Sequence, residues 1–232
     1  LDLAFDERAG LLVGAAVNMN RIIANPEINA VYPFLVEASR TVASYQLRSR
    51  ATIVGNICNA SPAGDTIGAC MAYDGVAVVN GLNGVREEPL RTFFVGPGKT
   101  VLNAGDIVSA LRIPVPAPGH ASRYIKLGRN AVGDLAIVGV TALGFADKTA
   151  VSGTRFRLVL ASVAPVPLVP VEAEEILAGA PITEDSIKAA AKAAEAAATP
   201  INDTRGSARY RKLMVHNLVE KAVTEVCQQL KG

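Results

Sequence analysis

The sequence predicts an α+β protein, and three observations support this fold class. Half of the residues are hydrophobic, so a chain of 232 residues has enough apolar surface to bury one or two cores. Several short apolar runs are bounded by Gly, Asn or Pro, which is typical of strands. In the second half of the chain, strand-like runs are followed by segments with helical periodicity, as in α+β domains.

The first elements are expected to be a strand and two helices. Leu11–Val17 is a short apolar run, which indicates a buried strand. Asn18 or Asn20 is placed to cap a short helix that ends before Pro26. A longer helix is predicted over Glu27–Val42, because apolar residues recur there at spacings of three and four.

The regular patterns stop between Ala43 and Asp74. Gly, Asn, Ser, Pro and Asp are crowded in this stretch, which predicts a functional loop region and no regular element. Arg48 and Arg50 lie within it, and a solvated face is the default for both, with a phosphate or a partner subunit as the alternative. Three strands are predicted after the loop region, over Val76–Asn80, Arg91–Val95 and Ile107–Pro114.

The segment Val115–Ser122 is the best candidate for a linker between two domains, because prolines and a glycine are concentrated there. Three strands are expected beyond it, over Arg123–Leu127, Ala136–Phe145 and Phe156–Val163. Three helices are expected next, over Glu172–Ala178, Asp185–Ala198 and Ser207–Leu230. Ser207 is a suitable N-cap for the last helix, which carries one apolar stripe.

The composition argues against several classes of function. The net charge is +2 and no dense Lys/Arg tract is present, so a nucleic-acid partner is not expected. The cysteines and histidines are Cys58, Cys70, Cys227, His120 and His216. These are too few for this chain alone to build a zinc site or an iron–sulfur cluster, and they favour a reducing, cytoplasmic compartment. The most apolar stretch is broken by prolines, so no membrane span is expected, and the charged first ten residues do not resemble a signal peptide.

The segment Thr52–Thr66, TIVGNICNASPAGDT, carries the strongest chemical signal. Gly55 and Gly64 are free to take a positive φ, and successive exposed amides in such a turn form an anion-binding concavity. Ser61 adds a hydroxyl donor, and Asp65 is an acceptor suited to ribose or ribityl hydroxyls. These residue types suit a phosphate-bearing cofactor. The alternative is a tight structural loop whose Asn and Ser side chains satisfy their own backbone.

The longer segment Gln46–Asp65 closely resembles the flavin-binding subunit of molybdenum hydroxylases, the class that includes xanthine dehydrogenase and aerobic carbon monoxide dehydrogenase. In that family an arginine-flanked turn leads to T-I-G-G-N and then to N-A-S-P and an Asp. Other stretches agree in order: GLLVGAAVNMNRIIANPEI, GDIVSALRIP, YIKLGRNAVGDLAIVGV and RGSARYRKLMVHNLVEKAV. The resemblance therefore extends over essentially the whole chain.

The resemblance implies a fold and a set of cofactor-binding residues. Residues 1–116 would be the second part of a flavin-binding domain of the vanillyl-alcohol-oxidase/PCMH type. Residues 120–232 would be a C-terminal α+β domain with a small antiparallel sheet and helices. FAD would lie between the two domains. The cofactor-binding residues would be Thr52, Gly55, Asn56, Ala60, Ser61, Asp65, Ile107, Val108 and Lys126.

The resemblance also implies separate roles for these residues. Gly55 and Asn56 match the loop at the phosphates and the ribityl chain, and Asp65 matches a hydroxyl acceptor. Lys126 matches a lysine near the flavin ring, where a cation would favour an anionic reduced flavin. The alternative for Lys126 is an exposed strand lysine. Ile107 and Val108 match apolar residues beside the cofactor, and their alternative is plain strand core.

Two departures from the family pattern bear on cofactor binding. Val54 stands where the family usually has the first glycine of a pair, and a β-branched side chain there is expected to crowd a phosphate. The earlier glycine-rich loop of the family, which resembles A-G-G-T-D-L, does not occur in this sequence. We therefore expect the first flavin subdomain to be absent from residues 1–232. FAD would then bind only when that N-terminal segment is supplied, unless cofactor binding has been lost.

The function implied by the resemblance is electron transfer within a larger enzyme. A large partner subunit would carry molybdopterin and oxidise the substrate, and a small partner would carry [2Fe–2S] clusters. Electrons would then reach FAD on this chain and pass to NAD+ or another acceptor. One alternative is a cofactor-free assembly subunit that retains the fold. Another is a standalone flavin oxidoreductase, which would need catalytic groups of its own.

Overall fold

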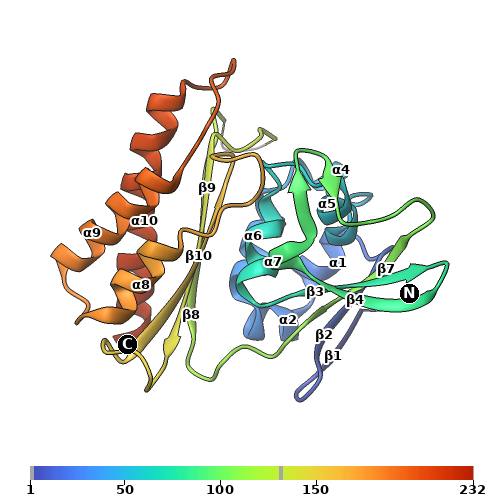
Figure 1. Ribbon diagram of the computed structural model, residues 1–232. Coiled ribbons are helices and arrows are strands. Elements are labelled where there is room, and N and C mark those ends of the chain that lie inside the picture. The colour runs from blue at the N-terminus through green and yellow to red at the C-terminus, as the bar shows by residue number, and fades with distance from the viewer. Residues whose placement is uncertain (1–2, 131–132, 232) are drawn as a thin grey trace.

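The structure is a computed structural model, and it describes residues 3–130 and 133–231. Four layers follow one another across the molecule (Figure 1): a five-stranded sheet, a layer of helices, a three-stranded sheet and an outer layer of helices. Residues 131 and 132 belong to the stretch that resembles the opening of the second domain. They lie outside the described residues, as do the ends of the two expected domains at 1–2 and 232.

The N-terminal half builds the five-stranded sheet, in which all neighbouring strands are antiparallel. In spatial order, the strands are β1 Leu3–Asp6, β2 Gly10–Gly14, β7 Ile107–Ile113, β3 Val76–Gly81 and β4 Gly84–Pro89. The strands expected from the apolar runs are therefore present as β2, β3 and β7. Strands β1 and β4 are not expected from the sequence, because both are short edge strands and β4 is largely polar.

Three short helices follow β2, namely α1 Met19–Ala24, α2 Pro26–Val31 and α3 Pro33–Thr41. Asn18 caps α1 as expected, since its side chain accepts a hydrogen bond from the Arg21 amide at 3.0 Å. The single helix expected over 27–42 is wrong. Tyr32 leaves the helical conformation with φ −125° and ψ 56°. Pro33 explains the break, because proline lacks an amide hydrogen and disfavours a helical residue before it.

The stretch between Ala43 and Asp74 contains helices, so the expected loop region is wrong. Its helices are α4 Tyr45–Arg48, α5 Ile53–Asn59 and α6 Asp65–Ala72. All residues of α6 are buried, so this helix lacks the polar face that normally reveals a helix in a sequence. The strand expected over 91–95 is also corrected, because α7 Leu90–Phe93 precedes a short strand there. That strand, β5 Phe94–Gly96, pairs with β6 Lys99–Thr100.

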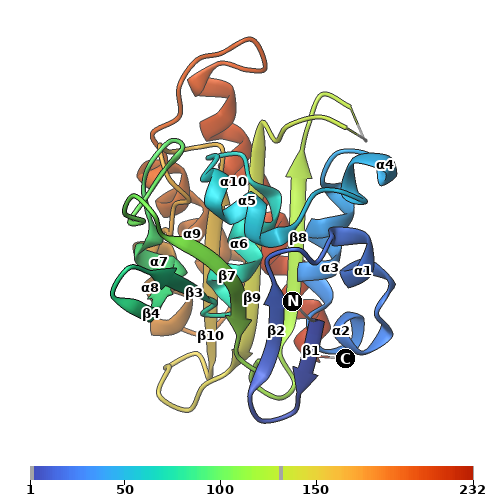
Figure 2. The same cartoon turned by 90° about the vertical axis from the view of Figure 1, so that its right-hand side faces the viewer.

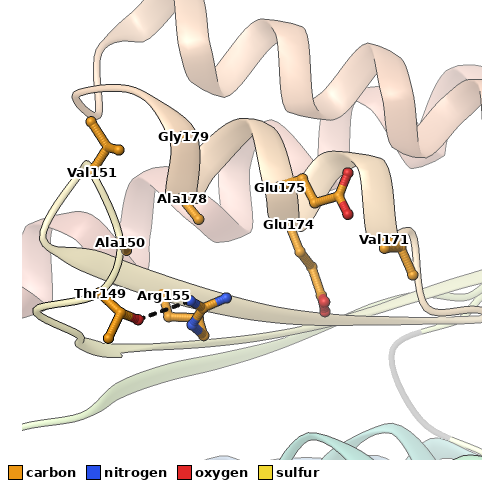
Figure 3. A pocket seen from close by; sticks show the side chains of 9 residues that line it. All are labelled: Thr149, Ala150, Val151, Arg155, Val171, Glu174, Glu175, Ala178 and Gly179. Atoms are coloured by element: carbon orange, nitrogen blue, oxygen red, sulfur yellow. Dashed lines mark hydrogen bonds between the residues drawn. The ribbon is translucent and has the colours of Figure 1, made fainter.

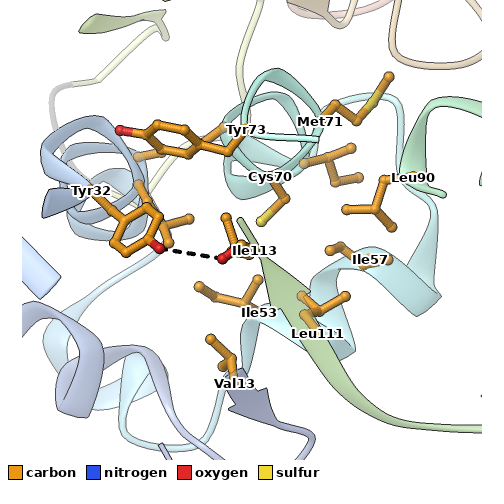
Figure 4. Packing of buried hydrophobic residues seen from close by; sticks show 14 of the residues in the cluster. Val13, Tyr32, Ile53, Ile57, Cys70, Met71, Tyr73, Leu90, Leu111 and Ile113 are labelled. Atoms are coloured by element: carbon orange, nitrogen blue, oxygen red, sulfur yellow. Dashed lines mark hydrogen bonds between the residues drawn. The ribbon is translucent and has the colours of Figure 1, made fainter. Parts of the chain in front are cut away.

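The helices of the N-terminal half pack on the five-stranded sheet around one apolar core (Figure 4). Val13 and Leu111 come from the sheet, Ile53 comes from α5, and all three side chains are fully buried. Tyr32 places a fully buried phenol in this core. Its hydroxyl donates to the carbonyl oxygens of Ile113 and Pro114 at 3.3 and 3.2 Å, so the buried phenol is paired.

The second half of the chain forms a three-stranded antiparallel sheet followed by helices, as expected. The strands are β8 Ala121–Leu127, β9 Val138–Ala146 and β10 Thr154–Ala161, with β9 in the centre. The helices are α8 Val171–Gly179, α9 Glu184–Ala197 and α10 Ala208–Lys231. The α+β fold class and the small antiparallel sheet with helices are thus confirmed.

The three-stranded sheet is covered on both faces (Figures 1 and 2). Helices α8 and α10 pack on one face, whereas α3 and α6 of the N-terminal half contact the other. The first seven residues of β9 are all buried. A strand that is buried on both faces shows a continuous apolar run and no alternation, and VGVTALG has this pattern. The two halves therefore share one extended interface.

Gly68 allows α6 to approach this sheet closely, and we expect Gly68→Ala to destabilise the protein. A methyl group at Gly68 would overlap the Thr141 hydroxyl and lie 3.3 Å from Thr141 Cβ. Overpacking of this kind costs about 1–3 kcal/mol. Thermal unfolding is the measurement. Gly179→Ala is the control, because no atom lies within 4 Å of the added methyl group, and its effect should stay within about 0.5 kcal/mol. Equal effects of the two substitutions would contradict the close packing.

Candidate functional site

The motif segment forms two short helices joined by a tight turn. Thr52 caps α5, because its Oγ1 accepts a hydrogen bond from the Gly55 amide at 2.8 Å. The helix ends at Ala60, which has the left-handed conformation with φ 48° and ψ 35°. Gly64 then precedes α6 with an ordinary φ of −71°. Gly55 and Gly64 therefore do not use their freedom to take a positive φ, and Ala60 is the residue of this segment with that conformation.

Gly64 serves a different purpose from the one expected. A Cβ at this position would lie 3.0 Å from Ile67 Cγ1 and 3.2 Å from Asn56 Oδ1. Glycine is thus required for the close approach of α5 and α6, and not for its backbone freedom. Gly55 is exposed on the first turn of α5.

Several polar side chains of the motif are engaged locally. Asn56 Oδ1 accepts a hydrogen bond from the Thr66 hydroxyl at 2.7 Å, which ties α5 to α6. Ser61 Oγ accepts from the Ala63 amide at 3.3 Å. Together with the Thr52 cap, these bonds match the alternative in which the side chains satisfy nearby groups. They also fix the shape of the turn that would meet a cofactor.

Val54 does not crowd the surface of the motif. Its side chain is 3% exposed and belongs to the apolar core of the N-terminal half. Gly55, the next residue, is exposed. The concern raised by the missing glycine is therefore corrected, because the second position of α5 faces the core. Valine here adds buried apolar surface and leaves the outer side of the helix unchanged.

Asp65, at the start of α6, joins the motif to the second half of the chain. Its Oδ1 accepts a hydrogen bond from the Tyr124 hydroxyl at 2.6 Å, and its Oδ2 lies 2.9 Å from Lys126 Nζ. Lys126 Nζ also donates to the Thr41 carbonyl oxygen at 3.0 Å. The Lys126 side chain is only 10% exposed, so the alternative of an exposed strand lysine is wrong. The structure thus brings together two of the residues expected at the cofactor.

Burial raises the pKa values of Asp65 and Tyr124. Burial raises the pKa of Asp65, while the Lys126 charge and the hydrogen bonds from Tyr124 and Lys126 oppose that rise. Burial also raises the pKa of Tyr124 well above its ordinary value, and the charge of Asp65 adds to this effect. The Tyr124 hydroxyl is therefore protonated at neutral pH. It acts as a donor to the carboxylate.

Further contacts fix strand β8 against helices from both halves. Glu37 of α3 accepts a hydrogen bond from the Tyr124 amide at 2.9 Å and forms an ion pair with Arg123. Arg123 Nε also lies 2.6 Å from Glu225 of α10. These bonds hold β8, which carries Tyr124 and Lys126, in one position relative to the motif.

The turn after α3 is a part of the site that the sequence analysis missed. Arg48 Nη1 donates to the carbonyl oxygens of Arg40 and Val42 at 3.0 and 2.8 Å, so the solvated face expected for this arginine is wrong. Ala43 in the same turn has a positive φ of 44°. Because Lys126 binds the neighbouring Thr41 carbonyl, this turn lies beside Asp65. The only hint in the sequence is the arginine that precedes the motif.

The two apolar residues expected beside the cofactor lie on opposite faces of the sheet. Val108 is buried in the core with α5, whereas the Ile107 side chain is 67% exposed at the start of β7. Adjacent strand residues point to opposite faces, so only one of the two can face the helices. Plain strand core therefore describes Val108 and is wrong for Ile107.

A cavity of about 310 Å³ separates the motif turn from loops of the second half. Ser61–Ala63 form one wall, and the opposite wall includes Leu135, Ala164, Pro165 and Arg205. Two backbone bonds hold the motif at this cavity. Ser162 N donates to the Pro62 carbonyl oxygen at 2.7 Å, and Gly98 N donates to that of Ala60 at 3.0 Å. The cavity is mainly apolar, with hydroxyl and guanidinium groups on its walls.

A second cavity, of about 380 Å³, lies between the β9–β10 turn and α8 (Figure 3). Glu174 is turned toward β10, where it accepts a hydrogen bond from the Leu158 amide at 2.7 Å, and burial raises its pKa. Arg155 is paired with Asp147. These side chains are already used within the domain, and the cavity contains no residue of the motif.

Within 3–130 and 133–231, no group of three or more His, Cys, Asp or Glu side chains is arranged to hold a metal ion. In the same part of the chain, no helix combines the length and the apolar character needed to cross a membrane.

Comparisons with known protein families cover most of the chain. Residues 2–116 match the family described as the FAD binding domain in molybdopterin dehydrogenase. Residues 123–226 match the CO dehydrogenase flavoprotein C-terminal domain.

Individual relatives agree with these matches. The carbon monoxide dehydrogenase medium chain of Hydrogenophaga pseudoflava is 33% identical over 94% of this chain and 75% of its own length. A putative xanthine dehydrogenase FAD-binding subunit of Escherichia coli is 27% identical over 97% of this chain and 77% of its own. A solved structure of carbon monoxide dehydrogenase from Hydrogenophaga pseudoflava matches with a TM-score of 0.92 and 32% identity. That match covers 98% of this chain and 78% of the other.

Proposed function

This chain belongs to the family of FAD-binding medium subunits of molybdenum hydroxylases, and from this membership we propose its place in an electron-transfer route. It is an oxidoreductase component with an FAD-binding domain. Substrate is oxidised at molybdenum on a large partner subunit. Electrons then pass through [2Fe–2S] clusters on a small partner to FAD held by this chain, and from there to NAD+ or another acceptor.

The fit of FAD to this chain is supported mainly by the group around Asp65. A buried carboxylate with a cation and a hydroxyl donor beside it suits a ligand that is rich in hydroxyls. We assign the phosphates to the exposed first turn of α5 around Gly55, and the hydroxyl-bearing chain to Ser61 and Asp65. Asn56 and Ala60 shape the turn. Val108 packs against α5 in the core. Lys126 influences the cofactor by holding the Asp65 carboxylate in an ion pair.

We assign the approach of the electron acceptor to the cavity beside the motif turn. Its walls combine apolar side chains such as Leu135 and Pro165 with the Ser61 hydroxyl and the Arg205 guanidinium. Such a lining suits a planar ring with a polar edge, as in a nicotinamide or a quinone. The role of this chain is to bind and orient both partners of the transfer and to exclude water from the contact.

The two expected domains remain a proposal. We assign residues 1–116 to the FAD-binding domain and 120–232 to the C-terminal domain, with the interface of α3 and α6 against the three-stranded sheet between them. We also assign the complex to the cytoplasm. The free thiols of Cys58, Cys70 and Cys227 are consistent with a reducing compartment.

The two alternative functions, a standalone flavin oxidoreductase and a cofactor-free assembly subunit, require features that differ from those of the proposed subunit. A standalone flavin oxidoreductase needs an acid–base pair of its own at the ring, and the Asp65–Lys126 pair is occupied in holding the two halves together. Two features of the sequence favour a cofactor-free assembly subunit, namely Val54 and the missing first glycine-rich loop, and of these Val54 in fact faces the core. FAD content separates these functions. The full-length protein is co-expressed with large and small subunits from the same genome, and flavin per complex is measured by extraction and visible absorption. About one FAD per chain supports the proposal, and a flavin-free complex contradicts it.

Filling the cavity should impair reduction of the acceptor and leave reduction of the flavin unchanged. Ala164→Trp places an indole in the cavity, and we expect the KM for the acceptor to rise about tenfold, which equals about 1.4 kcal/mol. Substrate-driven flavin reduction, followed by stopped-flow absorption, should keep its rate. Val151→Trp in the second cavity is the control and should alter neither step. Unchanged acceptor kinetics in Ala164→Trp would exclude this cavity as the acceptor site.

A further inference from the structure

Tyr124 is placed to control the carboxylate of Asp65. Tyr124 and Lys126 are two residues apart on β8, so their side chains leave the same face of the strand. They bind different oxygens of Asp65, at 2.6 and 2.9 Å. A carboxylate held through both oxygens has little freedom to rotate. The Tyr124 side chain is itself buried, and its main-chain amide is tied to Glu37 at 2.9 Å.

The two hydrogen bonds leave one lone pair free on each oxygen of the Asp65 carboxylate. An ionised carboxylate offers about four lone-pair positions, and Tyr124 and Lys126 fill one on each oxygen. We propose that Tyr124 is a positioning residue of the flavin site: it orients Asp65 and keeps it ionised, so that its remaining lone pairs accept a hydroxyl of FAD. This inference rests on the proposed function, because it assigns FAD to the site. It adds to that function the dependence of cofactor binding on a phenol from the second half of the chain.

The charges around Asp65 make the hydroxyl important. Lys126 on β8 is the cation in contact with the carboxylate. Glu37 on α3 also faces this region, but Arg123 neutralises it, and Glu225 on α10 is paired with the same arginine. Burial favours the neutral form of Asp65, and the hydrogen bond from Tyr124 opposes this effect. Removal of the hydroxyl therefore shifts the balance toward a protonated Asp65, which loses part of its capacity to accept.

The test is the pH dependence of FAD affinity in the complete complex. FAD is removed, and the complex is titrated with FAD at several pH values from neutral down to the lowest pH at which it stays assembled, with fluorescence quenching as the signal. In the wild type, affinity should fall on acidification as Asp65 takes up a proton. In Tyr124→Phe the midpoint of this fall should move to higher pH by about one unit, as expected when a hydrogen bond to the charged form is lost.

Tyr32→Phe is the matched control. It also removes a buried hydroxyl that is paired twice, but its partners are the backbone oxygens of Ile113 and Pro114, and it makes no contact with Asp65. It should lower thermal stability without moving the midpoint. If Tyr124→Phe lowers affinity equally at every pH, Tyr124 is merely structural and the inference is wrong. A wild type whose affinity shows no midpoint also overturns it.

The wild-type titration separates a failure of the proposed function from a failure of this inference. A wild-type complex that binds no FAD contradicts the proposed function, whereas a wild type that binds FAD with an unmoved midpoint in Tyr124→Phe contradicts only this inference. If the Phe variant does not assemble, fluorotyrosine incorporated at position 124 replaces it. Fluorine makes the phenol a stronger donor, so the midpoint should move to lower pH. A shift in the other direction, or none, would overturn the inference.

Discussion

Asp65→Ala should empty the flavin site and destabilise the protein by about 3–5 kcal/mol, because it breaks a buried ion pair and leaves its cation behind. Lys126 is 10% exposed, and without Asp65 its ammonium group retains only the Thr41 carbonyl oxygen among the partners described above. The Tyr124 hydroxyl loses its acceptor at the same time. FAD content of the purified complex and its thermal unfolding are the two measurements.

Asp147→Ala is the matched control for Asp65→Ala. Asp147 also pairs with a basic side chain, Arg155, but that side chain is 45% exposed, against 10% for Lys126. Exposed ion pairs contribute about 1 kcal/mol or less, so Asp147→Ala should cause a small loss of stability and retain FAD. If both variants lose stability equally, or if Asp65→Ala keeps full FAD content, Asp65 is not the central group of the site.

The double variant Asp65→Ala with Lys126→Met separates cofactor binding from stability. Replacing both members of a buried pair by apolar side chains is often nearly neutral for folding. The double variant should therefore recover most of the stability that Asp65→Ala loses. Its FAD content should stay low, because the hydroxyl acceptor is still missing. Recovery of both properties would mean that Asp65 acts on FAD only through the fold.

The second half of the fold can be predicted from the sequence because its helices have one buried and one exposed face and its central strand is one continuous apolar run. The apolar stripe of α10 is an example, since Val215, Val219, Ala222 and Val226 are buried and return at spacings of three and four. The helices over 43–74 cannot be recognised in the sequence, because the main one has no exposed face. Helix α6 is buried on every side, and Gly68 lies in it for packing, so neither a polar stripe nor the glycine indicated a helix.

The site was only partly accessible for a different reason. The motif over Thr52–Thr66 is contiguous, so its residue types and its family resemblance are visible in one segment. Tyr124 is 59 positions from Asp65 in the chain, and no local pattern links a strand tyrosine to a helix-initiating aspartate. The role of Val54 likewise depends on which side of α5 meets the core, and a helix that short leaves its orientation undefined in the sequence.

Arg211 joins three loops beside the cavity that is lined by the motif turn. Its replacement should destabilise the protein about as much as Asp65→Ala does. Its side chain is 2% exposed. Nη1 donates to the carbonyl oxygens of Ile137 and Ser162 at 2.6 and 3.0 Å, and Nη2 donates to Asp203 at 2.6 Å. Backbone amide hydrogen bonds, with Arg211 and Arg205, lower the pKa of Asp203 to about 2. A lowered pKa stabilises the fold above the unfolded value of 3.8, so this contribution is lost only as pH falls from about 4 to about 2.

Arg211→Leu should therefore destabilise the protein by about 3–5 kcal/mol, which for a chain of this length lowers Tm by roughly 6–20 °C. The leucine fills part of the space but leaves two buried carbonyl oxygens without a donor, and that desolvation is the main cost. Arg205→Leu is the control, because Arg205 pairs with the same carboxylate but is 26% exposed, and its loss should cost about 1 kcal/mol or less. Both variants are followed by calorimetry on the assembled complex at neutral pH. Equal losses would mean that the ion pair with Asp203 carries the effect. A larger loss in Arg211→Leu assigns it to the buried carbonyl bonds, which hold the cavity wall in place.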